Sequence, residues 1–121
     1  MKDFRNLHVW ERSHRLTLAI YAATLRFPRE ELYSLTNQIR RCAVSISANI
    51  AEGCGKTGNN EFQRFLQIAG GSASELDYEL LLARDLGYPT QPDYSRIADE
   101  LSQIRKMLSS LLQKVNVDRR I

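Results

Sequence analysis

The chain has 121 residues, of which 43% are hydrophobic and 26% charged, a composition typical of a folded globular domain and not of a disordered or fibrous protein. Its formal net charge of +3 and its pI of about 9.1 are compatible with nucleic-acid binding without requiring it. The N-terminal residues are too charged for the apolar core of a signal peptide, and no apolar run approaches the ~20 residues that span a bilayer. We therefore expect a cytoplasmic protein that has no membrane partner.

The first predicted helix covers residues 7–26. Positions at steps of three and four residues, the helical period, form a largely apolar stripe. The stripe consists of Leu7, Trp10, His14, Leu18, Tyr21 and Leu25. Asn6 is a favourable N-cap residue. Phe27-Pro28 should end the helix, because the residue before a proline is disfavoured in the helical region.

The second predicted helix covers residues 35–52 and follows a connector with room for one helical turn. Ser34 is the expected N-cap, and Gly53 is the residue expected to end the helix. The front stripe of this helix consists of Leu35, Ile39, Cys42, Ile46 and Ile50. Asn49 and Ser45 lie beside this stripe, and we expect them to form a side-chain network that fixes the register of the helix.

The sequence GCGKTGNN makes residues 53–60 a predicted loop, and the third helix follows over residues 60–86. Its core stripe consists of Phe62, Phe65, Leu66, Ala69, Ala73, Leu76, Leu80 and Ala83. The fourth predicted helix covers residues 91–115, with Thr90 as its N-cap and Asp93 in its first turn. Its stripe consists of Tyr94, Ile97, Leu101, Ile104, Leu108, Leu111 and Val115. Four amphipathic helices with short links predict a single all-α domain, an antiparallel up-and-down four-helix bundle.

The two middle helices carry apolar residues on more faces than a lone bundle needs, since one stripe per helix is enough to build its core. The third helix also contains six small residues in a row at positions 69–74, which would let another helix approach closely. We therefore expect a homo-oligomer. Its interface is predicted to include Val44, Ala48, Ala51, Ile68, Tyr78 and Leu82. The alternative is that these are scattered surface apolar residues, which are common.

The sequence contains no recognisable catalytic constellation. A di-metal centre in a bundle needs Glu from two helices and Glu-x-x-His from the other two. The single match is Glu11-Arg12-Ser13-His14, and the other histidine, His8, lies in the same helix. The Gly-Lys-Thr run within residues 53–58 lacks the glycine spacing and the preceding strand of a phosphate-binding loop. We expect a non-enzymatic protein with no cofactor and no metal, whose two cysteines are free thiols.

Surface charge is the remaining functional signal, and most of the 17 basic residues are arginine. The residues predicted to contact the phosphates of RNA or DNA are Arg40, Arg41, Lys56 and Arg64. No aromatic residue alternates with them, so base stacking on single strands has little support. The alternative is that these cations are solvated, or paired with Glu30, Glu52 or Glu61.

Three stretches carry a family resemblance: "LHVW" at 7–10, "QIRRCAVSISANIAEG" at 38–53 and "EFQRFLQIAGGSASEL" at 61–76. They resemble the four-helix-bundle proteins of the 23S rRNA intervening-sequence (S23) family over about residues 4–88. The resemblance implies a bacterial protein that assembles as a homopentameric ring, and it carries over no catalytic residues. It also implies a relation to the accessory variability proteins of diversity-generating retroelements, which bind a reverse transcriptase and nucleic acid. The loop after Gly53 has only Lys56 where the family commonly has more basic residues, which weakens the expectation of strong RNA binding.

Two functions remain open at this stage. The first is a non-enzymatic oligomeric bundle that contacts RNA or DNA backbones through its basic residues. The alternative is a protein-interaction scaffold, or an accessory subunit for a polymerase-like partner.

Overall fold

The structure is a computed structural model that describes the backbone of residues 2–120 and the side chains of residues 2–116. That part of the chain forms four α-helices and two short 3₁₀ helices, and it contains no strand. The four helices are α1 (His8–Thr24), α2 (Leu35–Cys54), α3 (Asn59–Asp85) and α4 (Gln91–Arg120), and the 3₁₀ helices are Phe4–Asn6 and Arg29–Glu31. The predicted all-α class with four helices is therefore confirmed.

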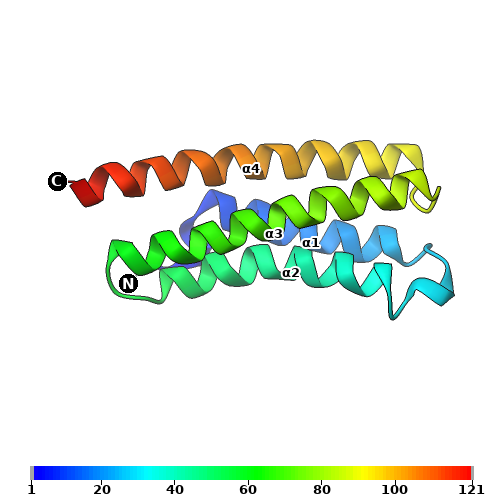
Figure 1. Ribbon diagram of the computed structural model, residues 1–121, viewed down its shortest axis with the longest axis horizontal. Coiled ribbons are helices and arrows are strands. Elements are labelled where there is room, and N and C mark those ends of the chain that lie inside the picture. Colours follow the sequence, from blue (N-terminus) through cyan, green and yellow to red (C-terminus); the bar gives the residue numbers. More distant parts are fainter. Residues whose placement is uncertain (1, 121) are drawn as a thin grey trace.

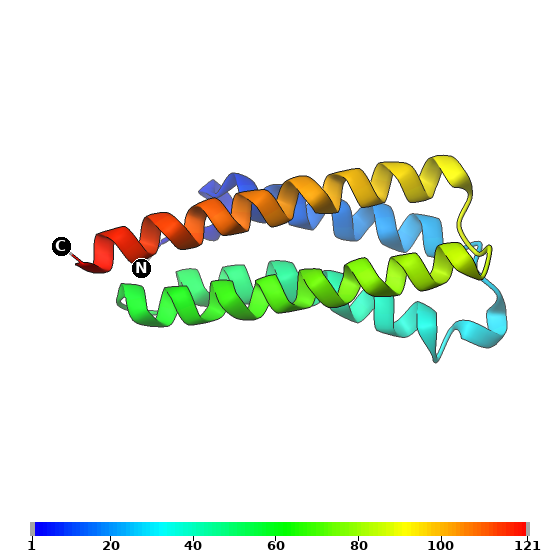
Figure 2. The same ribbon diagram turned by 45° about the horizontal axis from the view of Figure 1, so that its top comes forward.

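Successive helices run in opposite directions along one long axis (Figure 1). Each helix packs against two neighbours, because α1, α2, α3 and α4 contact one another in order and α4 then contacts α1. The contact between α2 and α3 is the most extensive. A turned view shows the two pairs, α1 with α4 and α2 with α3, running side by side (Figure 2). The two chain ends and the α2–α3 loop share one end of the bundle.

Two of the three predicted N-caps differ from the structure. Thr90 caps α4 as expected, since its Oγ1 accepts a hydrogen bond of 3.2 Å from the backbone N–H of Asp93. Asn6 does not cap α1, because it belongs to the preceding 3₁₀ helix and Leu7 takes the cap position without a side-chain bond. Ser34 occupies the cap position of α2 but its side chain makes no capping bond.

The predicted end of the second helix at Gly53 is wrong. Gly53 lies inside α2, which continues to Cys54 and has Gly55 as its C-cap. A Cβ atom at Gly53 would lie 2.9 Å from the Cβ of Phe65 and 3.2 Å from Cδ1 of Phe62. The glycine is therefore required by the close approach of α3, and the helix stop is provided by the residues that follow it.

The predicted core stripes of the second and third helices are buried along their whole length. In α4, Tyr94 and Leu111 are half-buried and the other stripe positions are buried. The helix also continues past its predicted end at Val115 as far as Arg120. Gly87 follows the C-cap of α3 and has a φ of 77°, a conformation that glycine adopts without strain.

The predicted stripe of the first helix is not its core face. Leu18, Tyr21 and Leu25 are exposed, and Leu25 reaches 78% exposure. The buried face of α1 instead consists of Val9, Ser13, Leu16, Thr17, Ile20, Ala23 and Thr24. Its hydroxyl groups donate hydrogen bonds to carbonyls one turn earlier, at 2.7 Å for Ser13, 2.8 Å for Thr17 and 2.7 Å for Thr24. Because these groups are satisfied within the helix, a face that looks polar in sequence can be buried.

Among the residues that the structure describes, none of the helices combines the length and the apolar character needed to cross a membrane.

Candidate functional site

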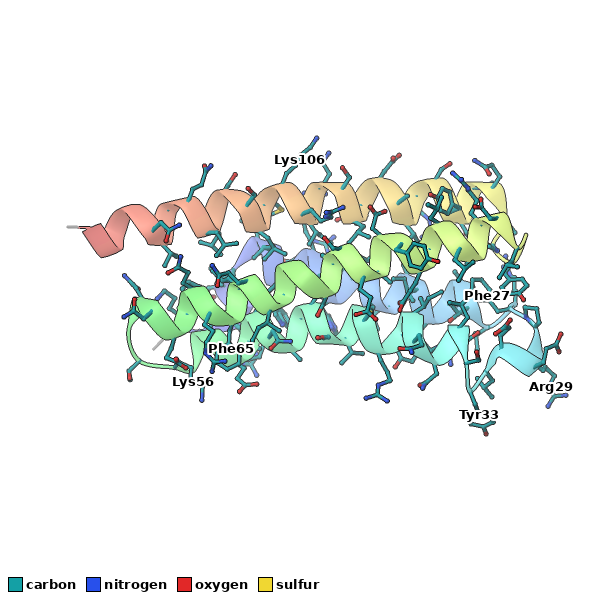
Figure 3. All side chains as sticks on the ribbon, viewed as in Figure 1. Phe27, Arg29, Tyr33, Lys56, Phe65 and Lys106 are labelled. Atoms are coloured by element: carbon teal, nitrogen blue, oxygen red, sulfur yellow. The ribbon has the colours of Figure 1, made fainter. Side chains whose placement is uncertain are left out.

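Two predicted phosphate contacts lie together where α2 turns into α3. Lys56 lies close to the ring of Phe65 at this end of the bundle (Figure 3), with its Nζ atom 5.6 Å from the ring centroid. The Arg64 guanidinium carbon lies 4.5 Å from the same centroid. Arg64 also pairs with Glu61 at 3.2 Å, and this hydrogen bond lowers the pKa of Glu61. Lys56 forms no ion pair within residues 2–116, so its charge is available to an external anion.

The other two predicted phosphate contacts lie farther along α2. Arg40 donates a hydrogen bond of 2.9 Å from Nε to the Thr24 Oγ1 atom, and its guanidinium lies over the Tyr21 ring at 4.9 Å. Arg40 therefore ties α2 to α1. Arg41 is exposed and, among the described side chains, has no ion-pair partner. At about 1.5 Å per residue, Arg41 and the start of the loop are roughly 20 Å apart along the helix, so the four cations form two groups and not one patch.

The residues predicted as an oligomer interface are mostly open to solvent in the single chain. Val44 is 43% exposed, Ile68 40% and Tyr78 62%. Ala48 is exposed, whereas Ala51 and Leu82 are half-buried. Leu82 packs partly against the core. Further exposed apolar side chains lie on the outer side of α1, namely Leu18, Tyr21 and Leu25. The sequence pattern assigns these three residues to the apolar stripe of the first helix.

Gly70 and Gly71 are not explained by packing within the chain. A Cβ atom built at either position meets no atom within 4 Å.

The hydrogen-bonded network that was expected beside the core stripe of the second helix is present in the structure. Asn49 donates to the Ser45 carbonyl at 2.8 Å, and the Ser45 and Ser72 hydroxyls are 2.8 Å apart. This network connects α2 to α3.

The histidines of α1 do not form a metal site with the acids around them. His14 stacks on Trp10, with ring centroids 5.1 Å apart and planes inclined by 5°. Glu11 is engaged by Arg15 in an ion pair. The only group of three or more potential metal ligands within the described side chains lies elsewhere, at the α2–α3 contact.

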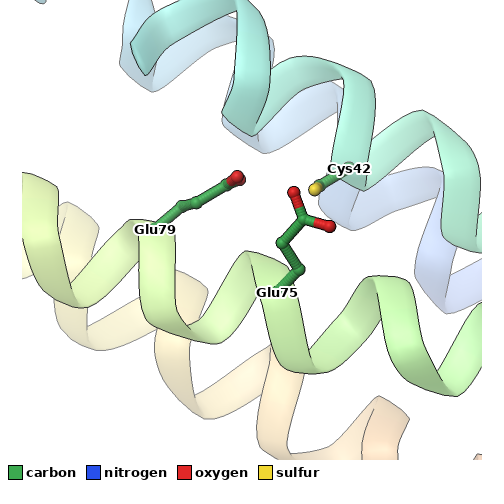
Figure 4. Close-up of side chains that lie close together, drawn as sticks. All are labelled: Cys42, Glu75 and Glu79. Carbon is green, nitrogen blue, oxygen red and sulfur yellow. The ribbon is translucent and has the colours of Figure 1, made fainter.

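That group consists of Cys42 from α2 and of Glu75 and Glu79 from α3, with their ligand atoms within 4.8 Å of one another. The three side chains extend toward a common point between the helices (Figure 4). Burial is the main cause that raises the pKa of Glu79 to about 7; the Glu75 carboxylate adds to the shift and the Cys42 thiol opposes it. Burial also raises the pKa of Cys42, and both carboxylates add to that shift. Sequence analysis did not identify this cluster.

A groove of about 340 Å³ lies between α1 and α4. Arg12 crosses it and pairs with Glu100 through two hydrogen bonds, of 2.7 and 2.8 Å. The other two arginines that line the groove, Arg15 and Arg96, pair with neighbouring acids of their own helices. Since each of these cations already has a carboxylate partner, the groove is a structural contact and a poor anion site.

The two cysteines of the chain, Cys42 and Cys54, are free and buried, as expected.

The comparisons with known proteins agree with this architecture. The sequence matches the family described as 23S rRNA-intervening sequence protein over residues 5–110. A crystal structure of a protein of unknown function from the S23 ribosomal protein family, from Bacteroides thetaiotaomicron, is 27% identical with a TM-score of 0.79, covering 87% of this chain and 95% of that chain. No curated protein sequence matches. Because the match covers most of the chain, the protein belongs to the 23S rRNA-intervening sequence protein family.

Proposed function

We propose that the protein is a non-enzymatic, oligomeric helical bundle that contacts the backbone of RNA or DNA through cations of α2 and of the α2–α3 loop. The observation that carries the proposal is that two of these cations are exposed and unpaired, whereas most arginines of the described chain are paired with acids. Among the described side chains, eight arginines form ion pairs with carboxylates, namely Arg5, Arg12, Arg15, Arg26, Arg64, Arg84, Arg96 and Arg105. Arg41 and Lys56 are exposed and form no such pair within the described residues.

Assembly into an oligomer would strengthen the weak phosphate binding expected from the few cations of one subunit. Arg41 and Lys56 are separated by about 20 Å along α2, so one subunit offers two isolated phosphate contacts. A ring of subunits repeats both contacts, and linked contacts bind with higher effective concentration than one contact alone. Arg40 and Arg64 assist from beside these residues, although each also has a partner within the chain.

The surface proposed for self-association spans the outer sides of the helices. Leu18, Tyr21 and Leu25 on α1 lie on the side of α2, since Arg40 stacks on Tyr21. Val44, one turn after Arg40 on α2, is also exposed. Several exposed large apolar side chains on one protein are a feature of interaction sites when they lie together. The open space beside Gly70 and Gly71 would admit a helix from a second copy; a pentamer is the assembly expected from the family resemblance.

Self-association can be tested with Ala48→Glu. A charge buried in an interface without a partner is strongly unfavourable, so we expect monomers or aggregated protein when the mass is measured by light scattering. The matched control is Ser102→Glu on the exposed side of α4, which should leave the mass unchanged. An Ala48→Glu protein with the wild-type oligomeric mass would place that residue outside the interface.

Backbone binding can be tested by titrating a structured RNA at several salt concentrations. Each phosphate contact that is removed should reduce the salt slope by ≈1, so Arg41→Ala and Lys56→Ala are each expected to lower both affinity and slope. Lys106→Ala is the control, because Lys106 is an exposed cation on α4 (Figure 3). Binding that is insensitive to salt, or equally weakened by Lys106→Ala, would contradict the proposal.

The alternative is a protein-interaction scaffold or an accessory subunit for a polymerase-like partner. The observation that favours it lies at the opposite end of the bundle, where Tyr33 is 91% exposed and Leu32 42% exposed. Tyr33 and Arg29 project from this end (Figure 3). Recovery of a protein partner that survives nuclease treatment, and that is lost in Tyr33→Ala, would favour the alternative over RNA binding.

A further inference from the structure

We propose that Cys42, Glu75 and Glu79 form a binding site for a thiophilic divalent cation of the Zn²⁺ class between α2 and α3. The three ligand atoms lie within 4.8 Å of one another. Two helices supply them, and Figure 4 shows the side chains converging from both. Thiolate and carboxylate are both ligands that Zn²⁺ accepts in proteins.

Binding of zinc would require only a small movement of the three side chains. Tetrahedral zinc with its usual bonds of about 2.3 Å to sulfur and 2.0–2.2 Å to oxygen places neighbouring ligands roughly 3.5 Å apart. The cluster would therefore contract by about 1 Å. Glu75 is exposed, so its side chain is free to rotate toward the cation. Solvent on that side supplies the fourth ligand as water, which is the arrangement of an open three-residue site.

A second observation points to a ligand independently of the cluster. Glu79 is only 7% exposed, and its Oε1 atom is buried without a hydrogen-bond partner. A buried polar atom without a partner costs about 1–3 kcal/mol, and more for a charged group. The carboxyl end of Glu79 points toward the other two side chains (Figure 4), where a cation would satisfy this oxygen.

The charge balance also favours a cation. Two carboxyl groups and a thiol, all of which are negative when ionised, have their ligand atoms within 4.8 Å of one another. A bound divalent ion compensates this negative charge and deprotonates a coordinating thiol outright. Binding therefore releases the Cys42 proton to solvent, together with any proton held by Glu79, and no bond other than the metal–ligand bonds is formed.

The sulfur ligand decides the class of cation. Ca²⁺ and Mg²⁺ take oxygen ligands and bind with six or more of them, whereas the described part of the chain gathers three groups here and one of them is a thiol. Soft ligands select zinc and similar metals. The site would act as a bridge that holds α2 to α3 at mid-length.

Cobalt is the probe that reports the sulfur ligand directly. Full-length protein, reduced and treated with a chelator, is titrated with Co²⁺, and the thiolate-to-cobalt absorption in the near ultraviolet is recorded. Wild type should bind one cobalt per chain with this absorption, and Zn²⁺ should displace it. Cys42→Ser should abolish the absorption. The matched control is Cys54→Ser, which removes the other buried thiol and should leave the absorption intact.

The carboxylates are tested by affinity. Loss of an outer-shell partner typically weakens metal binding ~10–100-fold, so loss of a ligand through Glu79→Gln or Glu75→Gln should weaken Co²⁺ binding by at least this factor. Glu75→Gln changes an exposed residue, so it keeps the test decisive if a buried variant fails to fold. Circular dichroism without metal verifies the fold of each variant. Zn²⁺ should raise the Tm of wild type and Cys54→Ser by mass action, and of Cys42→Ser much less.

Several outcomes would overturn the site. These are the absence of thiolate absorption in wild type, its persistence in Cys42→Ser, or affinity unchanged by both glutamate substitutions. A protein that binds no metal but whose oligomeric mass falls in Glu79→Gln would also overturn it, because the buried carboxylate would then be satisfied by a second copy of the chain.

Discussion

Gly53→Ala should destabilise the protein although it replaces a glycine within a helix. Alanine would normally gain about 1 kcal/mol there from helix propensity. The new Cβ would however lie 2.9 Å from the Cβ of Phe65, an atom fixed to the α3 backbone, so the helices themselves would have to separate. Such overpacking typically costs about 1–3 kcal/mol. The net expectation is a loss of roughly 0–2 kcal/mol, obtained by combining these two contributions.

The matched control is Gly55→Ala, two residues later. Gly55 has a φ of −79°, which alanine adopts readily, and its new Cβ would approach no atom closer than 3.5 Å. Reduced freedom of the unfolded chain should stabilise this variant by about 0.4–1 kcal/mol. Urea unfolding, at one protein concentration for all variants, would measure both. A Gly53→Ala protein as stable as Gly55→Ala would refute the close approach of α2 and α3 at this point.

Two further predictions concern a helix cap and an ion pair. Thr90→Ala removes the cap of α4 and should lower the free energy of unfolding by about 1 kcal/mol, as measured by thermal or urea unfolding. Ser34→Ala, at a cap position without a capping bond, should have little effect. Equal losses of stability in the two variants would contradict the assignment of Thr90 as a cap. The hydrogen bond from Arg12 lowers the pKa of Glu100, so this pair stabilises the fold above the unfolded pKa of about 4.3, and its contribution is lost as the pH falls through the lower folded pKa. Glu100→Gln should therefore flatten the acid side of the stability profile, and a variant with the wild-type profile would show that the pair does not couple to unfolding.

The fold was predictable because most stripes are long and regular. The positions from Ile39 to Ile50 repeat the helical period without a polar interruption, and all the stripe residues of α2 are buried. The prediction of the buried face of the first helix was wrong for a physical reason. Its apolar residues, such as Leu18 and Leu25, lie outside, while Thr17 and Thr24 are buried because their hydroxyls bond to their own helix. Hydrophobic periodicity cannot detect a hydroxyl that satisfies itself.

The candidate sites depend on information that one sequence does not contain. Arg41 and Lys56 could be named from their charge, but the engagement of Arg40 with α1 depends on the packing of two helices. The cluster of Cys42, Glu75 and Glu79 left a partial signal, since carboxylates four residues apart share a helix face. Which residue of α2 they meet is set by the register of the α2–α3 contact, and Cys42 is 33 positions away from Glu75 along the chain.

The order of helix contacts also bears on how the molecule forms and opens. The largest contact joins α2 and α3, which are connected by a short loop, so this hairpin can form early with little loss of chain entropy. The contact between α1 and α4 joins residues as distant as Arg12 and Glu100, 88 positions apart, and it closes the ring of helices last. Amide hydrogens of the α2–α3 hairpin should therefore exchange most slowly with solvent, and those of α1 and α4 earlier. The interior would thus first be exposed where the first helix parts from the last.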